Sequence, residues 1–136
     1  MKKHSILITI LMLLGCIYST KAQTYFSCTH RSTYSINKAL DGVSLINEFD
    51  ENSLFEMNSR RTMIEHTCPN IQSAYYIQQE SYDEEDEAYT FKVVSDASNE
   101  YIFIISFIDM NIKILGTDND GDNFLVVFTI KKIWTN

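Results

Sequence analysis

Two cysteines and two histidines are the residues of this chain best suited to nucleophilic or metal chemistry. His30 follows Cys28 by two positions, and His66 precedes Cys68 by two positions. Thiolates and imidazoles are the usual ligands of structural zinc, so the mirrored spacing suggests a Cys₂His₂ site. Such sites usually separate neighbouring ligands by two or more residues, which argues against zinc here. We therefore expect no cofactor at these residues.

A second set of potential ligands lies in the segment DNDGDN. Asp118, Asp120 and Asp122 alternate around Gly121, and spaced carboxylates in a turn suit Ca²⁺. An EF-hand loop would place Gly at its sixth position and Glu at its twelfth, whereas Gly121 is fourth from Asp118 and Thr129 is twelfth. Asp-Gly is also typical of hairpin turns, because these residues tolerate positive φ. We interpret the segment as a turn and keep the three aspartates as a weak metal candidate.

The remaining sequence offers no pattern specific to catalysis. Residues 83–87 are five consecutive acids, and like charges in a row repel one another and favour a solvated loop. The chain contains no Gly-rich phosphate loop, GxSxG, HExxH or Walker sequence. We therefore name no catalytic residue and leave enzymatic activity uncertain, with a non-enzyme favoured.

The elements that carry these residues are predicted to be strands. Residues 101–108 (YIFIISFI) are apolar on both faces except Ser106, as in a strand buried on both sides. Residues 124–134 alternate, and β-branched and aromatic side chains suit a pleated surface. A buried helix is the alternative for 101–108, because periodicity alone does not separate the two.

The rest of the chain contains further short segments of this kind, separated by turns. Residues 23–34 form either a first strand or an irregular lead-in, residues 35–40 are predicted to form a helical turn, and residues 50–52 a turn. Further strands are expected over residues 43–49, 53–58, 61–67, 73–79, 89–95 and 110–115. Short strands at regular spacing predict an all-β, mainly antiparallel fold: a meander of six to eight strands forming a small barrel or sandwich, with at most one short helix.

The N-terminus has the composition of a secretory signal peptide. A basic start is followed by the apolar residues 6–14 and a small-residue cleavage site that ends at Ala22. The apolar segment is shorter than the roughly 20 residues that a membrane-spanning helix needs. We predict a signal peptide over residues 1–22 and a single exported β-domain over residues 23–136, without a transmembrane span after cleavage.

Export has a second possible route and a consequence for the cysteines. Residues 13–16 (LLGC) resemble the lipobox of bacterial lipoproteins, although Leu14 is bulky for that motif, so Cys16 is a weak lipidation candidate. Either route leads to the periplasm, the outer membrane or the medium, where Cys28 and Cys68 form a disulfide candidate. Closing a loop of about 40 residues would stabilise the fold by roughly 4 kcal/mol in the chain-entropy model.

Charge restricts the partners of the exported domain. The whole chain has a net charge of −7, and loss of three lysines with the leader leaves eight basic and 18 acidic residues, or −10. This argues against nucleic acid and anionic membrane surfaces as partners.

We predict a non-catalytic binding or interaction protein of the envelope or medium. The alternative is a lipocalin-like carrier, in which the aromatic residues line a cavity for a small apolar ligand.

Overall fold

The computed structural model describes residues 22–37 and 42–136, in which it contains eight strands and no helix. Each strand pairs antiparallel with the next, and β1 pairs with β8, which closes a barrel in the order of the chain. The strands are β1 (Thr24–Asn37), β2 (Gly42–Met57), β3 (Met63–Cys68), β4 (Ile71–Asp83), β5 (Ala88–Ser95), β6 (Glu100–Ser106), β7 (Asn111–Thr117) and β8 (Asn123–Thr135). The predicted antiparallel all-β fold is confirmed in its barrel form.

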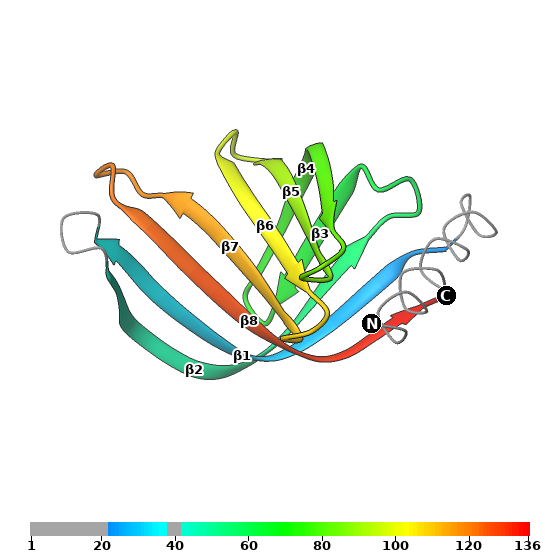
Figure 1. The fold of residues 1–136 in the computed structure, drawn as a ribbon, viewed down its shortest axis with the longest axis horizontal. Coiled ribbons are helices and arrows are strands. Elements are labelled where there is room, and N and C mark those ends of the chain that lie inside the picture. The colour runs from blue at the N-terminus through cyan, green and yellow to red at the C-terminus, as the bar shows by residue number, and fades with distance from the viewer. Residues whose placement is uncertain (1–21, 38–41) are drawn as a thin grey trace.

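Strand length differs sharply around the barrel. β2 has 16 residues, whereas its neighbour β3 has 6. β1 pairs with β2 along its whole length, but β2 pairs with β3 only from Leu54 to Met57. Figure 1 shows the consequence, a curved extension of β1, β2 and β8 beyond the other strands. We call residues 30–37 of β1 and 42–53 of β2 the arm.

The barrel centre is filled by aromatic and aliphatic side chains. Phe55, Phe91, Phe103 and Phe128 are fully buried, and Phe55 contacts two of them edge-on, with ring centroids 6.1 Å from Phe103 and 4.9 Å from Phe128. Edge-to-face pairs of this kind add about 1 kcal/mol each beyond their buried area. These four phenylalanines, from β2, β5, β6 and β8, thus occupy the core of the barrel.

Two local predictions were wrong, for one physical reason. A helical turn was predicted for residues 35–40, but Ser35–Asn37 continues β1, and residues 38–40 lie outside the described residues. A turn was predicted for residues 50–52, but these residues continue β2. In both places cross-strand pairing outweighs local preference. His30 Nδ1 lies 2.9 Å from the Asp50 carboxylate, so one of the supposed turn residues is held opposite a basic residue of β1.

The predicted hairpin of residues 53–58 and 61–67 is present as the end of β2 and β3. Asn58 fixes its turn, because the side-chain oxygen accepts hydrogen bonds from the backbone N–H groups of Thr62 at 2.8 Å and Met63 at 3.1 Å. The predicted signal peptide and Cys16 fall outside the described residues, apart from Ala22. Within the described part of the chain, no helix has the length and hydropathy of a membrane span.

Candidate functional site

The two predicted disulfide partners are free thiols in the structure. Cys28 of β1 pairs with Ser53 of β2, and on the other side of β2, Leu54 pairs with Thr67, the residue before Cys68. The cysteines therefore lie two strands apart, at roughly 9–10 Å between Cα atoms, beyond the ~7 Å that a disulfide spans. The structure therefore does not bring Cys28 and Cys68 to bonding distance, because β2 lies between the strands that carry them.

The histidines do not join the cysteines in a metal site. His30 contacts acids of β2, with 2.9 Å from Nδ1 to Asp50 and 3.9 Å from Nε2 to Glu48. His66 is buried among aromatic rings on the inner side of the barrel. Among residues 22–37 and 42–136, no three His, Cys, Asp or Glu side chains are grouped to hold a metal ion.

The DNDGDN segment forms a turn between β7 and β8. Asp118 Oδ1 accepts hydrogen bonds from the backbone N–H groups of Asp120 and Asp122, both at 2.9 Å, and Gly121 adopts a φ of +84°. An Asp side chain that bonds the backbone two residues ahead is typical of an Asx turn. The structure therefore gives Asp118 a role in the turn and does not bring the three aspartates into one ligand set.

The acidic run of residues 83–87 is also a turn, with one exception to the predicted exposure. Asp83 Oδ1 accepts hydrogen bonds from the backbone N–H groups of Glu85 at 3.0 Å and Asp86 at 3.2 Å. Glu87, the last acid, is buried. The first four acids thus match the predicted exposure, and the fifth is a buried turn residue directly before β5.

A charged pair lies on the inner side of the barrel at the base of the arm. Arg31 of β1 pairs with Phe49 of β2 and with Phe128 of β8, and its guanidinium carbon lies 5.9 Å and 5.5 Å from the centroids of these two rings. Glu51 of β2 approaches from the same side, with 3.8 Å between Arg31 Nη1 and Glu51 Oε1. That distance is an ion pair but too long for a hydrogen bond.

Two further polar side chains lie on the inner side of the barrel near this pair. Ser53 lies on the same face of β2 as Glu51, and His66 of β3 stacks on Phe55 with 4.1 Å between ring centroids. Burial, and then the charge of Arg31, lower the pKa of His66 to about 4, so its ring is neutral at neutral pH. We call Arg31, Glu51, Ser53 and His66 the Arg31 cluster.

Each member of the Arg31 cluster has a buried polar atom with an unused hydrogen-bonding capacity. These atoms have no hydrogen-bond partner among the described residues: Arg31 Nε, Glu51 Oε1, Ser53 Oγ and His66 Nε2. Most buried polar groups in proteins are satisfied, because an unsatisfied one costs about 1–3 kcal/mol. Four such atoms on the inner faces of β1, β2 and β3 make the Arg31 cluster a candidate site.

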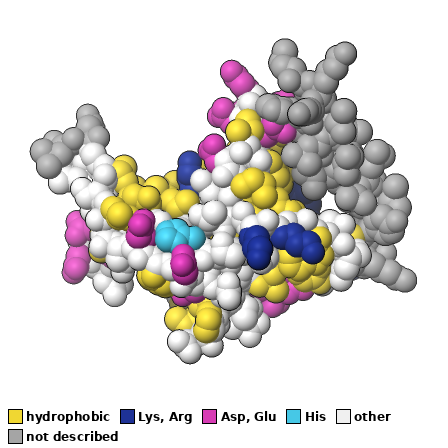
Figure 2. Space-filling model, turned by 90° about the horizontal axis from the view of Figure 1, so that it is seen from below, with side chains coloured by type: hydrophobic (Ala, Val, Ile, Leu, Met, Phe, Trp, Pro, Cys, Tyr) yellow, Lys and Arg dark blue, Asp and Glu magenta, His cyan; other side chains and the backbone are white. Residues whose placement is uncertain are grey.

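The arm presents a second candidate surface. Residues 43–53 of β2 pair with β1 on one side and with no strand of the described chain on the other. This free edge carries large apolar side chains that are 42–60% exposed: Val43, Leu45, Ile46 and Phe49. It contains neither Lys nor Pro, the residues that commonly block strand edges. Figure 2 shows hydrophobic and acidic side chains side by side at this end of the molecule.

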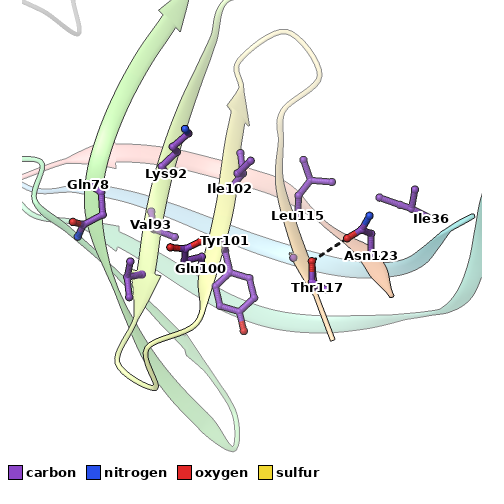
Figure 3. A pocket seen from close by; sticks show the side chains of 12 residues that line it. Ile36, Gln78, Lys92, Val93, Glu100, Tyr101, Ile102, Leu115, Thr117 and Asn123 are labelled. Atoms are coloured by element: carbon purple, nitrogen blue, oxygen red, sulfur yellow. Dashed lines mark hydrogen bonds between the residues drawn. The ribbon is translucent and has the colours of Figure 1, made fainter. Parts of the chain in front are cut away.

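A pocket of about 610 Å³ lies where β6 and β7 diverge. Ile102 and Leu115 are the last paired residues of these strands, and beyond them Tyr101 packs over Gly116. Figure 3 shows Lys92 on the β5 wall and the hydrogen bond of 2.9 Å between the Thr117 and Asn123 side chains at the other side. The pocket is mainly apolar and open to solvent, so it resembles a surface hollow more than the interior of a carrier.

No known family model, curated protein or solved structure matches this chain. Function is therefore inferred from the arm and the pocket between β6 and β7. Sequence reasoning singled out His66, as a zinc ligand, and missed its partners. The sequence did contain a signal for Glu51 and Ser53. If residues 50–52 are taken as strand, the alternation of side chains in β2 places both of them on the same inner face as Phe49 and Phe55.

Proposed function

We propose that this protein is a non-catalytic interaction protein that binds an extended segment of a partner protein along the free edge of β2. The observation that carries the proposal is that residues 43–53 of β2 have one edge that pairs with no strand of the described chain and that carries exposed apolar side chains. Such an edge offers a row of backbone N–H and C=O groups to an incoming strand. Backbone hydrogen bonds would supply affinity, and contacts to alternate side chains would supply specificity.

Charge supports a different protein rather than a second copy as the occupant. The chain has a net charge of −7, and the edge itself carries Glu48, Asp50 and Glu51. Pairing two copies would bring surfaces of the same sign together, whereas a basic segment would meet complementary charge. The proposed occupant is therefore an extended segment in which apolar residues alternate with Lys or Arg.

Filling of the barrel supports an interaction protein over the lipocalin-like alternative. A carrier needs an apolar cavity that encloses most of its ligand. In the described residues, buried phenylalanines fill the barrel centre, and the pocket between β6 and β7 is open. We further propose that the protein acts outside the cytoplasm, because residues 1–22 have the composition of a signal peptide.

Peptide binding followed by hydrogen exchange tests this function. The probe is a peptide of about ten residues, roughly the length of the free edge, that alternates Val and Lys. Two controls replace every Lys with Glu or a central Val with Pro. We expect the basic peptide to slow exchange of amides in residues 43–53 and to bind at least roughly tenfold more tightly than either control, a difference of about 1.4 kcal/mol.

Substitutions on the arm complete the test. Leu45→Lys and Ile46→Lys are expected to weaken binding of the basic peptide at least roughly tenfold, by adding like charge and removing apolar contact. Ile71→Lys is the matched control, since Ile71 is an equally exposed isoleucine on β4, outside the arm. Absence of protection with all peptides would contradict the proposal. Protection of the same amides by self-association alone would identify a second copy as the occupant and also overturn it.

A further inference from the structure

We propose that the pocket where β6 and β7 diverge binds a dipeptide of apolar residues with free ends, with Lys92 contacting its carboxylate and Glu100 its ammonium group. The pocket has a volume of about 610 Å³, within the range of roughly 300–1,000 Å³ that small-molecule sites occupy. None of the described residues that line it belongs to β2, although Ile36 of β1 is part of the arm. The proposal therefore does not depend on binding of a partner segment to the free edge of β2.

A row of side chains across three strands gives the pocket an apolar surface with a cation at one end. Lys92 of β5 pairs with Ile102 of β6, which pairs with Leu115 of β7 (Figure 3). Paired residues of neighbouring strands point to the same face, and Phe103, the next residue after Ile102, is fully buried in the core. The row is therefore on the outer face of the barrel, where it suits a ligand with apolar side chains and an anionic end.

Two opposite charges line the pocket and lack a partner. Lys92 and Glu100 are exposed, and neither has a hydrogen-bond or ion-pair partner among the described residues. Glu100 lies two residues before Ile102, which makes it a diagonal neighbour of Lys92, and such neighbours lie roughly 7–8 Å apart. The two ends of an extended dipeptide are about 7 Å apart. A dipeptide with free ends therefore supplies both charges, whereas a ligand with a single charge meets one repulsive group.

The strand ends beside the pocket favour a ligand that contains a peptide bond. β6 and β7 continue to Glu100 and Thr117, yet their pairing with each other ends at Ile102 and Leu115. Glu100 keeps its partner on β5, and Thr117 keeps its partner on β8. A strand end without a neighbour on one side presents backbone N–H and C=O groups. A peptide bond can donate to and accept from such groups, which a single amino acid cannot do in the same way.

Three forms of one dipeptide separate this proposal from general apolar binding. Leucyl-leucine carries both charges, its N-acetyl form only the negative one and its C-terminal amide only the positive one. In NMR titrations we expect leucyl-leucine to shift the backbone amide signals of Ile102 and Leu115. It should bind at least roughly threefold more tightly than either blocked form, as one exposed ion pair predicts, and at least roughly threefold more tightly than free leucine.

Two results of these titrations would overturn the proposal. One is equal affinity for the three forms or for free leucine. The other is a response confined to residues 43–53, which would place the dipeptide on the free edge of β2 instead.

Charge-neutralising variants test the two assigned contacts. In Lys92→Gln, leucyl-leucine should lose its advantage over the amide and keep its advantage over the N-acetyl form; in Glu100→Gln the reverse should hold. Lys113→Gln is the matched control and should leave the ranking unchanged, because Lys113 lies two residues before Leu115 on the same face of β7 and is not among the described residues that line the pocket. Lys92 and Glu100 are exposed, so neither substitution disturbs the core, and an unchanged ranking in both variants contradicts the proposal.

Discussion

Replacing His66 with phenylalanine isolates the free energy of a buried, neutral imidazole. Phenylalanine keeps a flat ring that can stack on Phe55, where the His66 ring lies at an interplanar angle of 2°. It removes the titrating group and the buried Nε2 atom that has no partner among the described residues. At pH 7, where the imidazole is neutral in both states, we therefore expect the variant to be as stable as the wild type within about 1 kcal/mol.

The difference should appear as the pH falls. Burial, and then the charge of Arg31, lower the pKa of His66 in the folded protein from 6.5 to about 4. Between these values the unfolded chain binds the proton and the folded protein does not, so folding stability decreases as pH falls through this window. The linkage relation gives a loss of about 2 kcal/mol at pH 5 and about 3 kcal/mol at pH 4.

Urea denaturation of both proteins at pH 7, 5 and 4 measures this loss. Acidic side chains also titrate in this range, but they are common to both proteins and cancel in the difference between the two free energies of unfolding. The wild type should therefore lose about 3 kcal/mol more than His66→Phe on going from pH 7 to pH 4. Parallel pH profiles would refute the reasoning and show that the imidazole is either solvated or protonated in the folded state.

Three other substitutions or treatments have defined outcomes. Gly116→Ala should lower the free energy of unfolding by about 1–3 kcal/mol in thermal or urea denaturation, because the new Cβ would lie 2.6 Å from the Phe124 ring. In Gly121→Ala the new Cβ would have no atom within 4 Å, so only the φ of +84° should lower the free energy of unfolding, by about 1 kcal/mol. An equal loss of unfolding free energy at both glycines would contradict the steric account. Alkylation by iodoacetamide followed by peptide mass mapping should modify Cys68 and spare Cys28, because burial raises the pKa of the Cys28 thiol to about 12.

Strand identity was predictable where the pattern of apolar residues was strong. Residues 101–108 were predicted as a buried strand, and β6 occupies Glu100–Ser106 with Phe103 and Ile105 buried. The alternation predicted for residues 89–95 is found in β5, where Phe91 and Val93 face the core. In these segments the local preference and the tertiary environment favour the same conformation, so the sequence alone suffices.

The arm was not predictable in this way, because it depends on contacts distant in sequence. Residues 50–52 are strongly turn-forming by composition, yet Asp50 pairs with His30 of β1, and Glu51 forms an ion pair of 3.8 Å with Arg31. The sequence does not specify which strands are neighbours, and that information decides whether Cys28 and Cys68 can bond. It also decides that Arg31, Glu51 and His66, from three different strands, meet on the inner side of the barrel.

Both candidate surfaces have one structural origin, the mismatch in length between β2 and β3. β2 has 16 residues and β3 only 6, and their pairing stops at Leu54. Residues 42–53 of β2, roughly 40 Å of strand, therefore continue without a second neighbour among the described residues. The same interruption leaves Glu51 and the base of the arm without a covering strand, which gives solvent access to the Arg31 pair. A longer β3 would close this edge, so the proposed binding of a partner segment would be lost.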